Sequence, residues 1–193
     1  MKKFGVLSLL GLAFSLSAQA DADFKPIFVG GVTYYSGSNT KSLVSSSEKF
    51  ISLTGEQAAR RLRATAAADF GVSSGTAYFG TDTPKYSMFS ASLAPGLFLF
   101  PFKDSSFQPF FGGKGVFGLQ RFSMGSPPTG LSASSQGFHF GYEVAIGIDL
   151  RFKKGDRGTA VRLYGAVRSI HGTVAGQSSY DLSGFRFGVG LVF

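Results

Sequence analysis

The two histidines are the first residues to consider for catalysis. His139 stands four residues before Glu143, and His171 stands two residues after Ser169. A histidine base needs a nucleophile or an orienting carboxylate within hydrogen-bond distance. Along an extended strand His139 and Glu143 are ~13 Å apart, whereas Ser169 and His171 share one face about 7 Å apart. The Ser169/His171 pair is therefore the one place for chemistry on lipids, and the sequence shows no acidic partner for it.

Isolated charged residues form the second group of interest. They alternate with apolar residues, as in GTAVRLYGAVRS, where Arg162 and Arg168 stand on the opposite parity to Leu163 and Val167. Successive side chains of a strand point to opposite faces, so this pattern predicts strands with one apolar and one polar face. The charges expected on the inner, polar face are Arg61, Arg63, Asp69, Lys114, Glu143, Asp149, Arg162, Arg168 and Arg186.

Seven segments show this alternation clearly. The purest runs from Phe138 to Leu150. Its length is ~41 Å at a rise of ~3.4 Å per residue, so a tilted strand can cross an apolar band of ~25 Å. The other six lie within residues 24–35, 61–73, 86–100, 107–122, 158–169 and 180–193.

An eighth strand is expected in residues 37–58, because bacterial single-chain barrels have even strand numbers. EKFISLT (48–54) is the only candidate there. A competing interpretation makes residues 55–69 a helix, since Ala, Arg, Gln and Glu are good helix formers and Thr54 with Gln57 resembles a capping box. The clean alternation from Leu62 to Val72 favours a strand instead.

The first twenty residues, MKKFGVLSLLGLAFSLSAQA, combine two lysines, a short apolar run and an Ala-x-Ala site. This pattern predicts a cleaved signal peptide over residues 1–20 and one barrel domain over residues 21–193. Cleavage removes Lys2 and Lys3 and lowers the formal charge from +8 to +6. The sequence has no cysteine, which excludes disulfides and cysteine-ligated zinc. We expect no catalytic residue, metal or cofactor.

The apolar face is expected to contact lipid. Charged residues make up only 16% of the sequence, against about 25% in soluble domains, and the polar parity consists mostly of Gly, Ala and Ser. Short charged turns (FKDSS and KKGDRG) alternate with Ser/Gly-rich loops, as expected for inner and outer connections of such barrels. The alternative is a soluble, lipocalin-like ligand-binding barrel with its apolar face inward.

The chain ends on FRFGVGLVF, with large apolar residues at every second position: Phe185, Phe187, Val189, Leu191 and Phe193. This ending resembles the C-terminal assembly signal of the small outer-membrane barrels of the OmpA and OmpX type. The resemblance implies an all-β, eight-stranded antiparallel up-and-down transmembrane β-barrel in the bacterial outer membrane. It also implies insertion by the barrel-assembly machinery and contact with membrane lipid. Basic residues near the outer rim are expected to bind lipopolysaccharide phosphates. We expect a monomer that binds no nucleic acid.

The expected function is non-enzymatic: a structural or surface-interaction role, with the lumen filled by ion pairs. Eight strands enclose a space that side chains just fill, and buried charges there must be paired. The sequence is compatible with two further alternatives. One is a narrow pore that favours anions, suggested by the excess of basic residues. The other is a lipid A-modifying enzyme that uses the Ser169/His171 pair.

Overall fold

The segments with alternating residues all form strands. The computed structural model describes residues 24–37, 47–57, 61–78, 81–102, 105–129, 132–152, 159–174 and 177–193, so the predicted signal peptide and the KKGDRG turn lie outside the described residues. The strands are β1 (Phe24–Tyr35), β2 (Ser47–Gln57), β3 (Leu62–Thr76), β4 (Lys85–Leu99), β5 (Phe107–Met124), β6 (Ser134–Arg151), β7 (Ala160–Val174), β8 (Gln177–Asp181) and β9 (Gly184–Val192). A search of the described residues found no helix of sufficient length and apolar character to cross a membrane.

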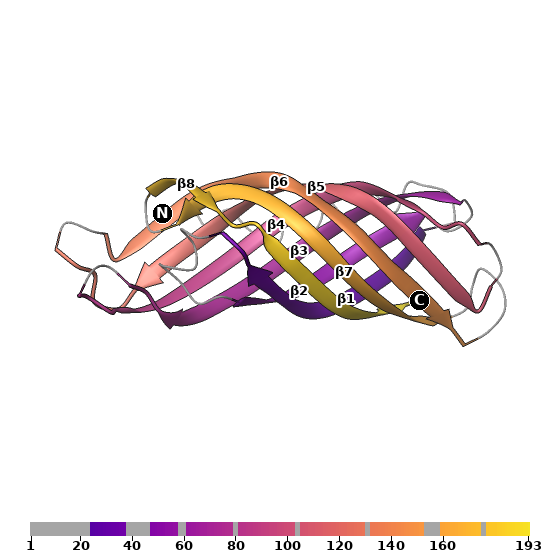
Figure 1. Cartoon of the computed structure of the whole chain (residues 1–193), viewed down its shortest axis with the longest axis horizontal. Coiled ribbons are helices and arrows are strands. Elements are labelled where there is room, and N and C mark those ends of the chain that lie inside the picture. Colours follow the sequence, from indigo (N-terminus) through magenta and orange to yellow (C-terminus); the bar gives the residue numbers. More distant parts are fainter. Residues whose placement is uncertain are drawn as a thin grey trace, which may run out of the picture.

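Eight of these strands close into an antiparallel barrel, which confirms the predicted fold class. Neighbours along the chain pair from β1 to β7, β7 pairs with β9, and β9 returns to β1. The closing register runs from Ile27 opposite Val192 to Tyr35 opposite Gly184. The short β8 pairs with the end of β7 at the rim of the barrel (Figure 1).

The apolar face of the barrel points outward. In β9, for example, Phe185 and Val189 are exposed, whereas Arg186 and Val192 are buried. The same alternation leaves large apolar side chains of all eight barrel strands on the exterior and places the charged parity inside. The lipocalin-like alternative, with apolar side chains inward, is therefore wrong for this chain.

The expected eighth strand is β2, and it lies within residues 37–58, where the sequence alternation is weakest. β2 contains EKFISLT and pairs with β1 on one side and with β3 on the other. The helical alternative for residues 55–69 is wrong, because residues 55–57 belong to β2 and residues 62–69 to β3. Intrinsic helix propensity is weak, and pairing on both sides of each strand overrides it.

The two ends of the barrel differ in the connections that they carry. Strands β2, β4 and β6 end, and β3, β5 and β7 begin, at the end of the barrel where the chain terminates, here called the C-terminal end. There the amide of Phe193 donates a hydrogen bond to the carbonyl of Pro26 (3.1 Å). Strands β1, β3, β5 and β7 end, and β2, β4, β6 and β9 begin, at the opposite end, here called the far end (Figure 1).

Two adjacent glycines of β1 differ in the space around them. Gly31 is on the inner parity, and a Cβ built on it collides with the carbonyl oxygen of Phe187 on β9. Gly30 is on the outer parity, and the nearest atom to its Cβ is the carbonyl oxygen of Phe50 at 3.9 Å, an ordinary contact. The close approach of β1 and β9 at this seam therefore requires glycine at position 31.

We predict that Gly31→Ala destabilises the barrel, because the added methyl forces β1 and β9 apart. A loss of about 1–3 kcal/mol is typical of such overpacking. The midpoint of urea-induced unfolding in detergent or lipid should therefore fall. Gly30→Ala is the matched control and should leave the midpoint unchanged. Equal midpoints for the two variants would show that the seam tolerates a side chain at Gly31.

Candidate functional site

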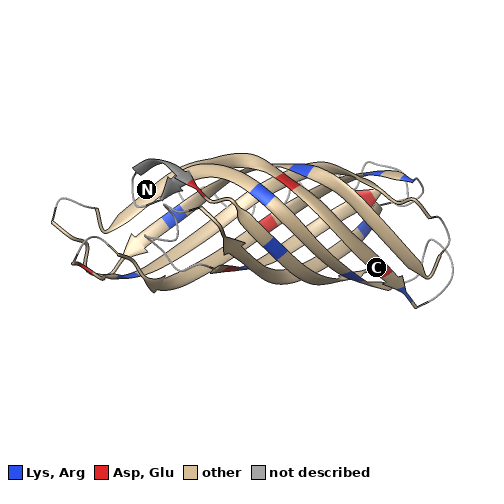
Figure 2. Ribbon diagram, in the orientation of Figure 1, with Lys and Arg blue, Asp and Glu red and all other residues tan. Residues whose placement is uncertain are grey.

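The lumen is arranged in layers that repeat along the strands. The inward-facing residues of β7 and β5 follow the same order from the C-terminal end: a polar, an aromatic, a small and a charged residue. On β7 they are Arg162, Tyr164, Ala166 and Arg168, and on β5 they are Gln108, Phe110, Gly112 and Lys114. Two groups of charges are thus separated by a layer of rings and small residues. Figure 2 shows basic and acidic positions on neighbouring strands along the barrel.

The lower charge cluster lies nearest the C-terminal end and comprises Glu56, Arg63, Asp149 and Arg162. Arg162 makes a two-point contact with Asp149 (2.7 and 2.9 Å) and also binds Glu56 (2.9 Å). Arg63 binds the other oxygen of Glu56 at 3.0 Å. Both carboxylates are almost fully buried. The cluster balances two positive charges with two negative ones, as burial in a narrow lumen requires.

The central charge cluster comprises Asp69, Lys114, Glu143, Arg168 and Arg186. Glu143, which has no exposed surface, lies 2.9 Å from Lys114, 3.4 Å from Arg168 and 3.5 Å from Arg186. Arg186 also binds Asp69 at 2.5 Å. Three cations therefore share two carboxylates, and Glu143 is the carboxylate that contacts all three.

An aromatic layer separates the two clusters and comprises Phe50, Phe98, Phe110 and Tyr164. Phe98 and Phe110 meet edge to face with their centroids 5.4 Å apart, and Phe50 and Tyr164 do so at 6.3 Å. Tyr164 packs against the apolar residues around both pairs. The layer spans the lumen between the charges.

Cations cover this layer on both sides. The guanidinium of Arg186, from the central cluster, lies 3.9 Å from the ring centroid of Phe50. The guanidinium of Arg162, from the lower cluster, lies 4.5 Å from that of Phe110. Both distances lie within the range of cation–π attraction, so the rings stabilise the same arginines that the carboxylates neutralise.

A polar chamber lies above the central cluster, toward the far end. It is lined by Tyr35, Glu48, Ser90, Gln120 and His139 together with Arg168 and apolar residues. Tyr35 donates a hydrogen bond to Glu48 (2.5 Å), and Ser90 donates another. Neither polar atom of the Gln120 side chain, nor Nδ1 of His139, has a partner among the described residues. The free volume of about 20 Å³ is enough for about one water molecule.

Apolar side chains close the lumen above this chamber. The rings of Tyr86 and Phe122 stack with centroids 5.4 Å apart. Met88, Met124 and Leu182 belong to the same buried cluster. Among the described residues, buried side chains thus fill the lumen toward the far end as well as in the middle.

Eight of the nine predicted lumen charges point inward and belong to the two clusters; Arg61 does not. Arg61 is exposed because β3 begins at Leu62, so the strand alternation does not extend to position 61. The prediction missed two buried acids, Glu48 and Glu56, and two buried cations, Lys25 and Arg151. Extending the alternation of residues 48–54 by two positions would have found Glu56.

The two histidines occupy different environments. His139 is buried in the polar chamber, whereas His171 is exposed on the outer face of β7, close to the ring of Phe140. Ser169 shares this outer face, as predicted. The register places Asp181 of β8 directly opposite His171. An acidic residue therefore does stand beside the Ser169/His171 pair, and the sequence did not reveal it because the pairing depends on the short β8.

No protein-family profile and no curated protein matches this chain. Among solved structures, it resembles Neisserial surface protein A (NspA), with a TM-score of 0.60, 11% identity and coverage of 88% of this chain and 94% of that one. It also matches Ail, the attachment invasion locus protein of Yersinia pestis, with a TM-score of 0.48, 8% identity and coverage of 88% and 95%. The fold is that of the small eight-stranded outer-membrane barrels, as predicted. The likeness to NspA supports this at the level of the fold.

We predict that Glu143→Gln destabilises the barrel, because Lys114, Arg168 and Arg186 lose the carboxylate that they share. Removing one partner of a buried ion pair costs about 3–5 kcal/mol, so the urea midpoint should fall clearly. Asp82→Asn is the control, since Asp82 is an exposed acid in the β3–β4 connection and its loss should leave the midpoint in place. An unchanged midpoint for Glu143→Gln would mean that Glu143 does not hold the cluster together.

Proposed function

We propose that this protein is a non-enzymatic, non-conducting barrel of the bacterial outer membrane, with a structural or surface-interaction role. The observation that carries the proposal is the closed lumen. An ion would have to cross two charge clusters, the aromatic layer between them and the apolar closure above the polar chamber. Paired charges and close-packed rings leave it no solvated route, which argues against the anion-favouring pore.

The exterior supports a membrane location. Large apolar side chains cover it, among them Phe138 (77% exposed), Ile146 (69%) and Phe117 (59%). An apolar surface this extensive marks contact with a membrane or a partner. We propose that the short connections at the C-terminal end face the periplasm and that the far end faces outward. We further propose delivery through the predicted signal peptide, insertion by the assembly machinery through Phe185–Phe193, and a monomer that contacts outer-membrane lipid and lipopolysaccharide.

A single preparation from the cell envelope tests this proposal. The protein should fractionate with the outer membrane and migrate differently on an SDS gel before and after boiling, because a closed hydrogen-bonded barrel resists cold SDS. In a planar bilayer it should produce no discrete conductance steps. Stepwise currents that favour anions would replace the proposal with a pore. A soluble protein with one gel mobility would contradict the membrane location.

A second candidate function, hydrolysis of an acyl ester in lipid, is favoured by one observation: Asp181 stands opposite His171, which shares an outer face with Ser169. In such a reaction the Ser169 hydroxyl attacks the ester carbonyl carbon. His171, opposite Asp181 in the register, takes the serine proton when the side chains of Ser169 and His171, about 7 Å apart along the strand, come within hydrogen-bond distance, and it transfers the proton to the leaving alcohol. Water then releases the fatty acid from the serine.

Mass spectra of lipid A decide between the two functions. We expect the same acyl pattern from cells that express the wild-type protein, the His171→Ala variant or no protein. Ser87→Ala serves as the control for an exposed serine elsewhere on the outer face. A missing acyl chain that returns with His171→Ala and with Ser169→Ala, but not with Ser87→Ala, would establish the enzyme and contradict the non-enzymatic role.

A further inference from the structure

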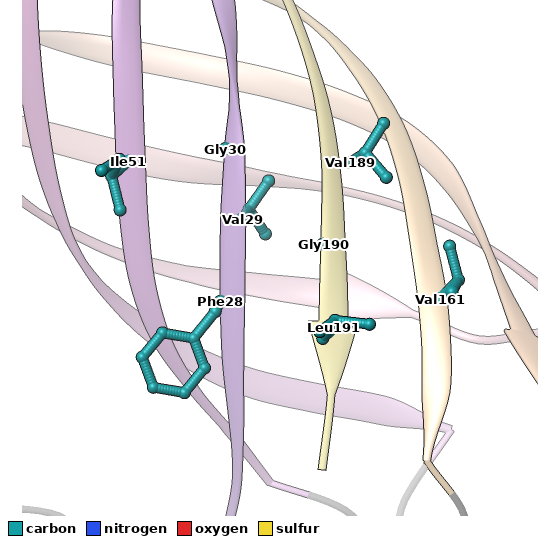
Figure 3. A pocket seen from close by; sticks show the side chains of 8 residues that line it. All are labelled: Phe28, Val29, Gly30, Ile51, Val161, Val189, Gly190 and Leu191. Atoms are coloured by element: carbon teal, nitrogen blue, oxygen red, sulfur yellow. The ribbon is translucent and has the colours of Figure 1, made fainter.

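A depression crosses the outer face of the barrel at the seam between β1 and β9. It has a volume of about 300 Å³ and is lined by Phe28, Val29, Gly30, Ile51, Val161, Val189, Gly190 and Leu191 (Figure 3). No lining residue is charged or carries a polar side chain. We call it the seam groove.

The groove exists because one residue of the outer face is glycine. Gly30 faces outward and pairs with Ile51 of β2 on one side and with Val189 of β9 on the other. Those two side chains are 60% and 59% exposed and form opposite walls, while the backbone at Gly30 forms the floor between them. Figure 3 shows Ile51, Phe28 and Leu191 around this floor, with Val161 beyond Leu191.

The position of the groove along the barrel indicates what surrounds it. Leu191 is two residues from the chain end, and Phe28 meets the ring of Phe193 with centroids 5.9 Å apart. The groove thus lies in the half of the barrel nearest the C-terminal end. If that end faces the periplasm, the surrounding hydrocarbon belongs to the periplasmic leaflet, which consists of phospholipid.

From this geometry we infer that the seam groove binds one acyl chain of a periplasmic-leaflet phospholipid. The inference rests on the proposed membrane location. The groove is continuous with the apolar exterior that lipid covers in the proposed location, and its volume is about 300 Å³. That is too small for a folded partner and suits part of one hydrocarbon chain. The walls bury the chain on two sides, whereas a smooth barrel face contacts it on one.

Gly30→Leu tests the inference because Gly30 faces outward with room for a Cβ, and a leucine side chain there would occupy the groove. The Cβ at position 30 meets only the carbonyl oxygen of Phe50, at 3.9 Å. Gly165→Leu is the matched control. Gly165 also faces outward, on β7, its Cβ would lie 3.6 Å from the ring of Phe187, and it does not line the groove.

The measurement is native mass spectrometry of the full mature protein, extracted from the outer membrane in mild detergent, with the retained lipid identified by fragmentation. Wild type and Gly165→Leu should retain one phospholipid. Retention by Gly30→Leu should fall roughly tenfold, as expected if about two methylene groups lose buried contact. Equal retention by Gly30→Leu, no lipid on the wild type, or lipid A in place of phospholipid would each overturn the inference.

Failure of the inference and failure of the proposed function give different results. A protein that shifts on SDS gels and fractionates with the outer membrane, but retains no groove-dependent phospholipid, disproves the lipid site alone. A protein absent from the outer-membrane fraction disproves the proposed location, and the lipid site falls with it.

Discussion

The structure depends on one constraint: the lumen of an eight-stranded barrel is too narrow to hydrate a charge, so each inward charge needs a partner within the protein. Glu143 meets this need for three cations and Glu56 for two arginines. The partners come from different strands, so the ion pairs also fix the strand register. The rings between the clusters then occupy much of the remaining space within the described part of the barrel.

Much of this arrangement was predictable from alternation alone, because the face of a strand residue depends only on its parity. The pattern around Arg162 and Arg168 placed both side chains inside and Leu163 outside, as the structure has them. The low charge content of the polar parity indicated that this parity forms the inner face, as the structure has it. Local sequence carries this information directly, since adjacent residues of a strand lie on opposite faces wherever the strand sits in the sheet.

What alternation could not provide is the identity of neighbours across strands. Asp181 lies opposite His171 only because β8 folds back on the end of β7, and no local pattern marks that register. The partner of Arg186 was equally hidden, since Asp69 lies on a distant strand. Arg61 shows the opposite error, because the predicted alternation included one residue before the first residue of β3. The seam groove could not be predicted from alternation either, because it depends on which residues lie opposite Gly30 and on the size of their side chains.

The pairing of Arg186 with Asp69 links the last strand of the barrel to the third. Neither charge has this partner until β9 reaches β1 and the cylinder closes. Mutual neutralisation of these two buried charges is therefore coupled to completion of the cylinder, so the ion pair stabilises the closed barrel and contributes nothing to a sheet that lacks its last strand.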